Sequence, residues 1–164
     1  MDDPTAEVGL TRGALYHNFG DKKGLLQAVI DRIDAEMAVR LRAVRDRAQT
    51  AWSGFLDESI AHTEMALEPE IQRIMLLDGP AVLGDPSRWP SQTACLRTTT
   101  EAIQALIDEG TVGPVDAEAA ARLLNGAALN ASLWIAAADD PRAVLAKAVD
   151  AFRHLAGGLL RTGG

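Results

Sequence analysis

The most distinctive group of polar and small residues lies near the start of the chain. Residues 9–16 read Gly-Leu-Thr-Arg-Gly-Ala-Leu-Tyr, so a glycine turn leads into a short helix and completes a helix-turn-helix. The first turn of that helix carries little bulk, which lets it approach base edges in the major groove of DNA. Arg12 can donate two hydrogen bonds to guanine, and Ala14 can contact a thymine methyl group. The pattern predicts DNA binding; the alternative is an ordinary helical corner with solvated polar residues.

Other side chains of this segment could hold the DNA backbone. Thr11, Tyr16 and Lys22 can reach phosphates, and the next helix begins near Lys22 with a partial positive charge. The predicted DNA-contacting set is Thr11, Arg12, Gly13, Ala14, Tyr16, His17 and Lys22.

Residues 9–26 resemble the signature of the TetR family of transcriptional regulators. In that family a glycine turn leads into a recognition helix capped by Thr or Ser, and a Tyr, a Phe and a Lys follow at fixed spacing. The resemblance implies phosphate contacts for Thr11, Tyr16 and Lys22, and a core position for Leu15 and Phe19. It also implies a homodimer, operator DNA and a small-molecule effector. Residues 71–84 resemble the family less specifically.

The same resemblance sets an expectation for the start of the chain. Family members carry a first helix and a full second helix before the glycine turn. Because Gly9 lies so close to Met1, we expect the first helix and part of the second to be missing.

The charge balance is acidic overall but uneven. The net charge is -7 and the pI is about 4.9, which by itself argues against nucleic acid as a partner. The basic residues concentrate in the first fifty positions, as Arg12, Lys22, Lys23, Arg32, Arg40, Arg42, Arg45 and Arg47. A small DNA-binding module on an acidic body explains this balance.

Nothing in the composition predicts export, a membrane span or a bound metal. Cys95 is the single cysteine, and we find no signal peptide. The most apolar stretch, 117–138, is interrupted by Glu118, Arg122, Asn125 and Asn130. We expect a cytoplasmic protein without cofactor or metal.

The fold class expected is all-α, since alanine and leucine dominate and alternating β-branched runs do not occur. Asp21, Asp116 and Asp140 are predicted helix caps. We expect a truncated helix-turn-helix domain with a connecting helix over 1–46 and a larger ligand-binding and dimerisation domain over 47–164. Helices are expected at 2–8, 11–19, 21–47, 50–67, 70–77, 92–109, 116–138 and 141–160, with an interruption at Gly79-Pro80, a loop at 83–90 and a late break at Gly157-Gly158.

Two helices, 116–138 and 142–160, are apolar around most of their circumference. A helix of this kind must bury two faces, and a four-helix bundle made by two subunits satisfies both. The alternative is that both helices are central in a monomer.

The middle helices are predicted to enclose a ligand cavity, and the aromatic and apolar residues there suggest an apolar or aromatic ligand. Asp78, Asn125 and Asn130 are polar groups that the interior must satisfy or offer to that ligand. The alternative is that most of these residues are ordinary core. The candidates are Trp52, Leu56, His62, Met65, Ile74, Leu77, Asp78, Trp89, Ile103, Asn125 and Trp134.

The proposed mechanism is a population shift, in which ligand and DNA prefer different spacings of two recognition helices. The helix over 21–47 joins the domains and is expected to transmit the conformational change from the ligand site to the recognition helix. By family resemblance the protein is a repressor, although an activator remains an alternative.

Two other classes of protein are alternatives to a DNA-binding regulator. An enzyme is favoured only by Ser59 and His62 on one helix face with Asp78 available, and no nucleophile elbow, phosphate loop or metal-ligand cluster accompanies them. A helical ligand-binding or dimerisation module without DNA binding is the second rival.

Overall fold

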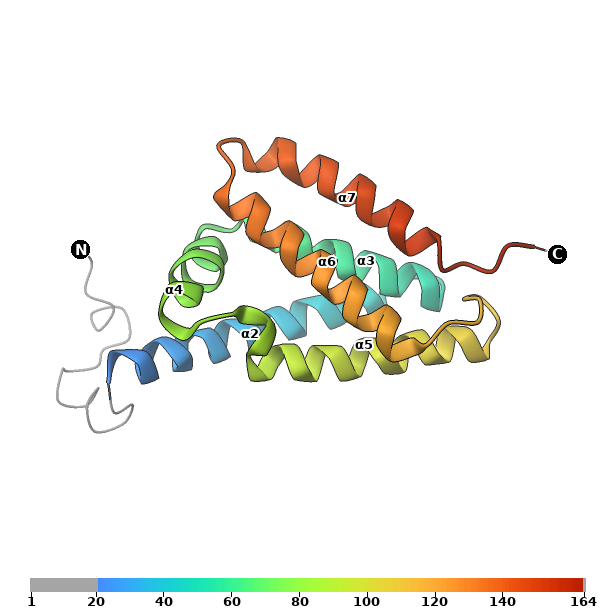
Figure 1. The fold of residues 1–164 in the computed structure, drawn as a ribbon, viewed down its shortest axis with the longest axis horizontal. Coiled ribbons are helices and arrows are strands. Elements are labelled where there is room, and N and C mark those ends of the chain that lie inside the picture. Colours follow the sequence, from blue (N-terminus) through green and yellow to red (C-terminus); the bar gives the residue numbers. More distant parts are fainter. Residues whose placement is uncertain (1–20, 164) are drawn as a thin grey trace.

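The computed structural model describes residues 21–163. Within that range every regular element is a helix, and the β pairing is limited to one isolated bridge between Val112 and Leu160. Figure 1 shows the helices packed as a bundle, with α6 running diagonally between α7 and α5. The all-α prediction is confirmed.

The helix expected over 21–47 is α2 (Lys22–Asp46). Its N-terminus is capped as predicted, because the Asp21 carboxylate accepts a hydrogen bond of 2.7 Å from the backbone N–H of Gly24. At 1.5 Å per residue the helix spans roughly 37 Å. Its buried residues, Leu25, Ile30, Ile33 and Met37, form one stripe at helical spacing.

The helix expected over 50–67 is α3 (Ala51–Glu64), followed by the 3₁₀ turn η1 (Met65–Leu67). Thr50 and Ser53 form a capping box that satisfies two backbone donors at its start. The helical segment ends at Leu67 as expected, but its last turn is a 3₁₀ turn.

The expectation of an interruption at Gly79-Pro80 is wrong. The π-helix η2 (Ile71–Asp78) runs directly into α4 (Gly79–Leu83). The Gly79 N–H donates to the carbonyl of Ile74, five residues earlier, and Pro80 lies in the first turn of α4, where no N–H is needed. A Cβ at Gly79 would lie 2.6 Å from that carbonyl oxygen, so glycine permits the continuous helix.

The remaining elements follow the predicted order. The segment expected as a loop holds a 3₁₀ turn, η3 (Pro86–Arg88), and α5 (Pro90–Asp108) begins slightly earlier than expected. Next come α6 (Ala117–Ala137) and α7 (Pro141–Gly157), which are capped by Asp116 and Asp140 as predicted. The chain leaves α7 before residue 160 because the tail pairs with the α5–α6 connector, through Gly113 N–H to Leu159 O at 2.9 Å and Arg161 N–H to Thr111 O at 3.0 Å.

The apolar interior has two main parts. The bundle core joins α3, α5, α6 and α7 and includes Phe55, Ile60, Ile103, Leu106, Leu124 and Phe152. The α2 core joins α2 to the π-helix and to the residue before α5, and consists of Ile30, Ile33, Met37, Met65, Ile71, Met75 and Trp89. Alanines at the buried positions of α6 let its neighbours approach closely.

Gly79→Ala is expected to lower the free energy of unfolding by about 1–3 kcal/mol, because the new methyl group overlaps the Ile74 carbonyl and meets Trp89 and Ile30. Denaturant unfolding at fixed protein concentration measures the change. Ala81→Ser, at an exposed site of the same short helix, should stay within about 0.5 kcal/mol of the parent protein. Unchanged stability of Gly79→Ala would show that the π-helix does not require glycine.

Candidate functional site

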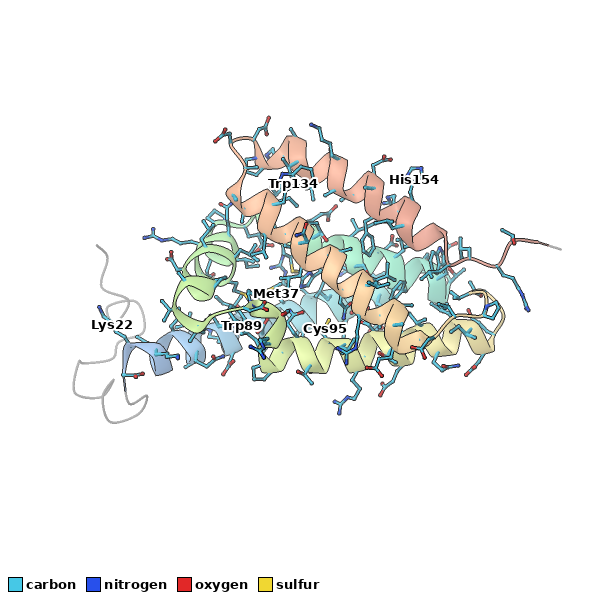
Figure 2. All side chains as sticks on the ribbon, in the orientation of Figure 1. Lys22, Met37, Trp89, Cys95, Trp134 and His154 are labelled. Atoms are coloured by element: carbon cyan, nitrogen blue, oxygen red, sulfur yellow. The ribbon has the colours of Figure 1, made fainter. Side chains whose placement is uncertain are left out.

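A cavity of about 470 Å³ lies between the two parts of the core. Its walls come from α2, α3, α5 and α6, with Phe152 reaching in from α7. Figure 2 places Met37, Trp89 and Cys95 in this part of the molecule and Lys22 at the far end of α2. The volume is in the range of sites that enclose small organic molecules.

Most of the cavity surface is apolar. Met37, Leu41, Phe55, Leu124, Leu129 and Phe152 contribute the larger apolar side chains, and alanines of α2, α5 and α6 fill the positions between them. An apolar body of a ligand would be held here by burial rather than by directed bonds.

Polar side chains gather on the α5 side of the cavity. The Thr99 hydroxyl donates to the Cys95 carbonyl at 2.8 Å and lies 3.2 Å from the side-chain oxygen of Asn125. The Asn125 amide in turn donates to the Cys95 sulfur at 3.7 Å. Burial raises the pKa of the Cys95 thiol, and the Thr99 hydroxyl opposes this effect. These contacts fix the position of the Cys95 side chain in the cavity wall, and burial favours its neutral form.

One ion pair crosses the α2–α3 side. Arg45 Nη1 lies 3.5 Å from Glu58 Oε2, and the Arg45 Nε lies 3.9 Å from Asp46. Burial raises the pKa of Glu58, and the Arg45 charge lowers it. The guanidinium is therefore already engaged on both sides.

Asp34 is a carboxyl group in a different setting. Burial raises its pKa, a hydrogen bond with Ser91 lowers it, and the charge of Asp31 raises it further. Its Oδ2 atom is buried without a hydrogen-bond partner, as is Nε1 of Trp89. Unsatisfied buried polar atoms are rare in proteins and often mark sites that bind something.

His62 lies one helical turn after Glu58 and faces the same cavity. Burial is the one resolved cause that changes its pKa, and it lowers the pKa. The imidazole is therefore neutral at neutral pH and can donate or accept a hydrogen bond.

The structure brings two of the predicted ligand-binding residues, His62 and Asn125, to the cavity wall. Met65, Trp89 and Ile103 lie in the core, while Trp52, Leu56 and Ile74 pack at its margins. Leu77 and Trp134 are exposed, and the exposed Asp78 lies 3.5 Å from Arg73.

Several cavity residues were not predicted from the sequence. Asp34, Glu58, Cys95 and Thr99 line the wall. One signal was available for Asp34, because a carboxylate stands within the apolar stripe between Ile33 and Met37. The threonine run 98–100 gave no comparable signal, since such residues also suit an exposed helix face.

The structure does not bring together the three residues that favoured an enzyme, Ser59, His62 and Asp78. The Ser59 hydroxyl donates to the carbonyl of Phe55 at 2.9 Å, and Asp78 does not line the cavity. Among residues 21–163, no cluster of three metal-ligating side chains occurs, and no helix is long and apolar enough to cross a membrane.

Of the predicted DNA-contacting residues, the structure describes Lys22. It is the first residue of α2 and is exposed. The others, from Thr11 to His17, lie outside the described residues, as do Leu15 and Phe19.

Comparison with known proteins assigns the family. The family model for the tetracyclin repressor-like, C-terminal domain matches residues 52–159. A solved structure of a TetR-family transcriptional regulator from Pectobacterium atrosepticum is 50% identical, with a TM-score of 0.89, and the match covers 100% of this chain and 84% of that one. A TetR transcription regulator from Haloarcula marismortui shares the fold at 22% identity, with a TM-score of 0.73 over 96% of this chain and 85% of that chain. No curated protein matches.

The chain therefore belongs to the TetR family, and it is a transcriptional regulator rather than an enzyme. The family resemblance seen at residues 9–26 and the match over 52–159 rest on different parts of the chain.

Asp34→Asn is expected to raise the midpoint of thermal unfolding at pH 7. The folded-state pKa of Asp34 is raised above 3.8, so the folded protein loses stability as pH rises from the unfolded pKa through the folded one. Asparagine avoids this cost, so the gain at pH 7 should shrink at pH 4.

Thermal melts at the two pH values, beside the exposed control Asp57→Asn, measure the effect. A lower midpoint for Asp34→Asn at pH 7 would contradict the prediction and show that the ionised carboxylate is stabilised in place.

Proposed function

We propose that this regulator binds operator DNA as a homodimer, acts as a repressor, and releases the DNA when a small molecule fills the cavity. The observation that carries the proposal is that α2 serves both ends of this coupling. The helix begins at Lys22, directly after the predicted DNA-reading segment, and its middle and last turns form a wall of the cavity through Met37, Leu41 and Arg45.

The geometry of α2 supports its role as a lever. Lys22 and Asp34 are twelve positions apart, or roughly 18 Å along a helix. The α2 core holds the intervening turns rigidly against the π-helix and Trp89. A ligand that displaces the cavity wall would therefore move the start of the helix as well. Such coupling between two sites is typically about 1–3 kcal/mol and acts equally in both directions.

The exposed face of α6 supports the dimer. Ala119, Leu123, Gly126, Asn130, Trp134 and Ala137 are all exposed and follow one another at steps of three and four. Leu123 is 76% exposed, Trp134 is 50% exposed, and Leu155 of α7 is 62% exposed. A nearly uncharged stripe with large apolar side chains is typical of a surface that is buried in an assembly.

The proposal also covers the domain boundary and the location of the protein. We propose that the boundary between the DNA-binding and ligand-binding domains lies near residue 46, where α2 ends. We also propose a cytoplasmic location, because the regulator must reach genomic DNA.

Arg12→Ala is expected to weaken specific binding to the DNA upstream of the protein's own gene. Loss of a bidentate contact to a base costs about 1–3 kcal/mol, or roughly 5- to 150-fold in affinity. Tyr16→Ala and Lys22→Ala each remove a predicted phosphate contact and should weaken specific and random DNA alike, and Lys22→Ala should also reduce the salt slope by about one. Fluorescence anisotropy at two salt concentrations measures both effects.

Arg97→Ala is the matched control, since Arg97 is an exposed arginine of α5 that does not line the cavity. Its binding should equal that of the parent protein. Failure of the parent protein to prefer this DNA over random DNA, with all variants alike, would favour a ligand-binding or dimerisation module that does not bind DNA.

Leu123→Glu is expected to shift the protein from dimer to monomer at micromolar concentration, because it buries an unpaired charge in the proposed interface. Sedimentation velocity measures the change. Val39→Glu introduces the same side chain at an exposed apolar position of α2 and should leave the dimer intact. A dimeric Leu123→Glu protein would assign dimerisation to another face.

A further inference from the structure

The cavity is rich in hydrogen-bond acceptors and in negative charge near Cys95. Asp34 comes from α2, Glu58 from α3 and Cys95 from α5. All three side chains line the same cavity, and besides burial the charges of Glu58 and Asp34 raise the pKa of the Cys95 thiol. The Thr99 hydroxyl lies 4.0 Å from the Cys95 sulfur, and the Asn125 amide nitrogen donates to that sulfur at 3.7 Å.

The carboxyl groups of Glu58 and Asp34 differ in whether a cationic side chain lies beside them. Glu58 has Arg45 at 3.5 Å. Among residues 21–163, no lysine or arginine forms an ion pair with Asp34, and its buried Oδ2 has no hydrogen-bond partner. A carboxylate with a buried oxygen and no cation is costly, and a cationic group placed beside it would offset that cost.

The basic side chains of the cavity are less suited to bind an anion than Asp34 is to bind a cation. Arg45 is shared between Glu58 and Asp46, and Arg42 is exposed. His62, which faces the cavity, stays neutral because burial lowers its pKa. A neutral imidazole does not repel a cation and can accept a hydrogen bond from one.

We propose that the effector is a protonated organic amine whose ammonium group lies beside Asp34, between α2 and α5, and whose apolar body packs against Phe55, Leu124 and Phe152. This inference rests on the proposed function and specifies the ligand chemistry of the same cavity. It refines the expectation of an apolar or aromatic ligand, because the apolar wall remains and one end of the ligand carries a charge.

Three probes with one tail test the charge of the head group, namely octylammonium, octanol and octanoate. Calorimetry gives the affinities. The rate at which a thiol reagent modifies Cys95, the single cysteine, reports whether this cavity is occupied. Octylammonium should bind the parent protein at least about tenfold more tightly than the other two and protect Cys95.

Asp34→Asn should reduce octylammonium affinity about tenfold or more and leave octanol affinity unchanged. The control Asp57→Asn removes the same charge from an exposed position outside the cavity and should change neither. Because the comparison among the three probes is made on the parent protein, it does not depend on how the variants fold.

The outcomes separate this inference from the proposed function. Tighter or equal binding of octanol or octanoate, with protection of Cys95, overturns the cationic ligand and leaves the cavity as an effector site. Retention of the octylammonium preference in Asp34→Asn overturns the role of Asp34. Absence of binding and of protection by all three probes overturns the cationic ligand, whereas DNA binding and dimerisation are tested separately by the anisotropy and sedimentation measurements above.

Discussion

The packing of the α2 stripe against Trp89 and the π-helix fixes the position of the other functional features. Ile30, Ile33 and Met37 can bury their side chains only if α2 lies along this surface. That placement leaves Asp34 and Leu41 facing α3 and α5 across an incompletely filled space, which is the cavity. It also directs the start of α2 away from the bundle, as Figure 1 shows. One apolar contact surface thus determines both the walls of the cavity and the direction in which the N-terminus of α2 points.

The cavity has an apolar part and a polar part. Toward α6 and α7 it is apolar, so it favours any body of suitable shape. Toward α2 and α5 it holds carboxyl, thiol, hydroxyl and amide groups whose mutual contacts are only partly satisfied. The apolar part supplies affinity and the polar part supplies selectivity, because an imperfectly satisfied polar group favours the ligand that completes it. Stability is lower as a result, since an ionised Asp34 is partly desolvated.

The helical order and the caps at Asp21, Asp116 and Asp140 could be predicted from the sequence, because capping and apolar periodicity are local properties. The cavity lining could not be predicted, because it depends on which side chains of α2, α3, α5 and α6 leave space between them. Trp89 and Met65 have the size and chemistry of pocket residues but fill the core, whereas Asp34 and Cys95 face the space. The continuous helix through Gly79 could not be predicted either, because Gly-Pro usually interrupts a helix, whereas here Pro80 lies in the first turn of α4.

The π-helix affects whether a one-residue deletion within this segment can be tolerated. A π-helix accommodates more residues per turn than an α-helix, so the segment from Ile71 to Asp78 stores excess chain between two fixed points, η1 and Trp89. Loss of one residue there would let the segment relax toward an α-helix, whose hydrogen bonds span four residues instead of five. The steric demand for glycine at 79 would then disappear. A single-residue deletion, usually disruptive within a helix, could therefore be absorbed at this place without moving the cavity walls.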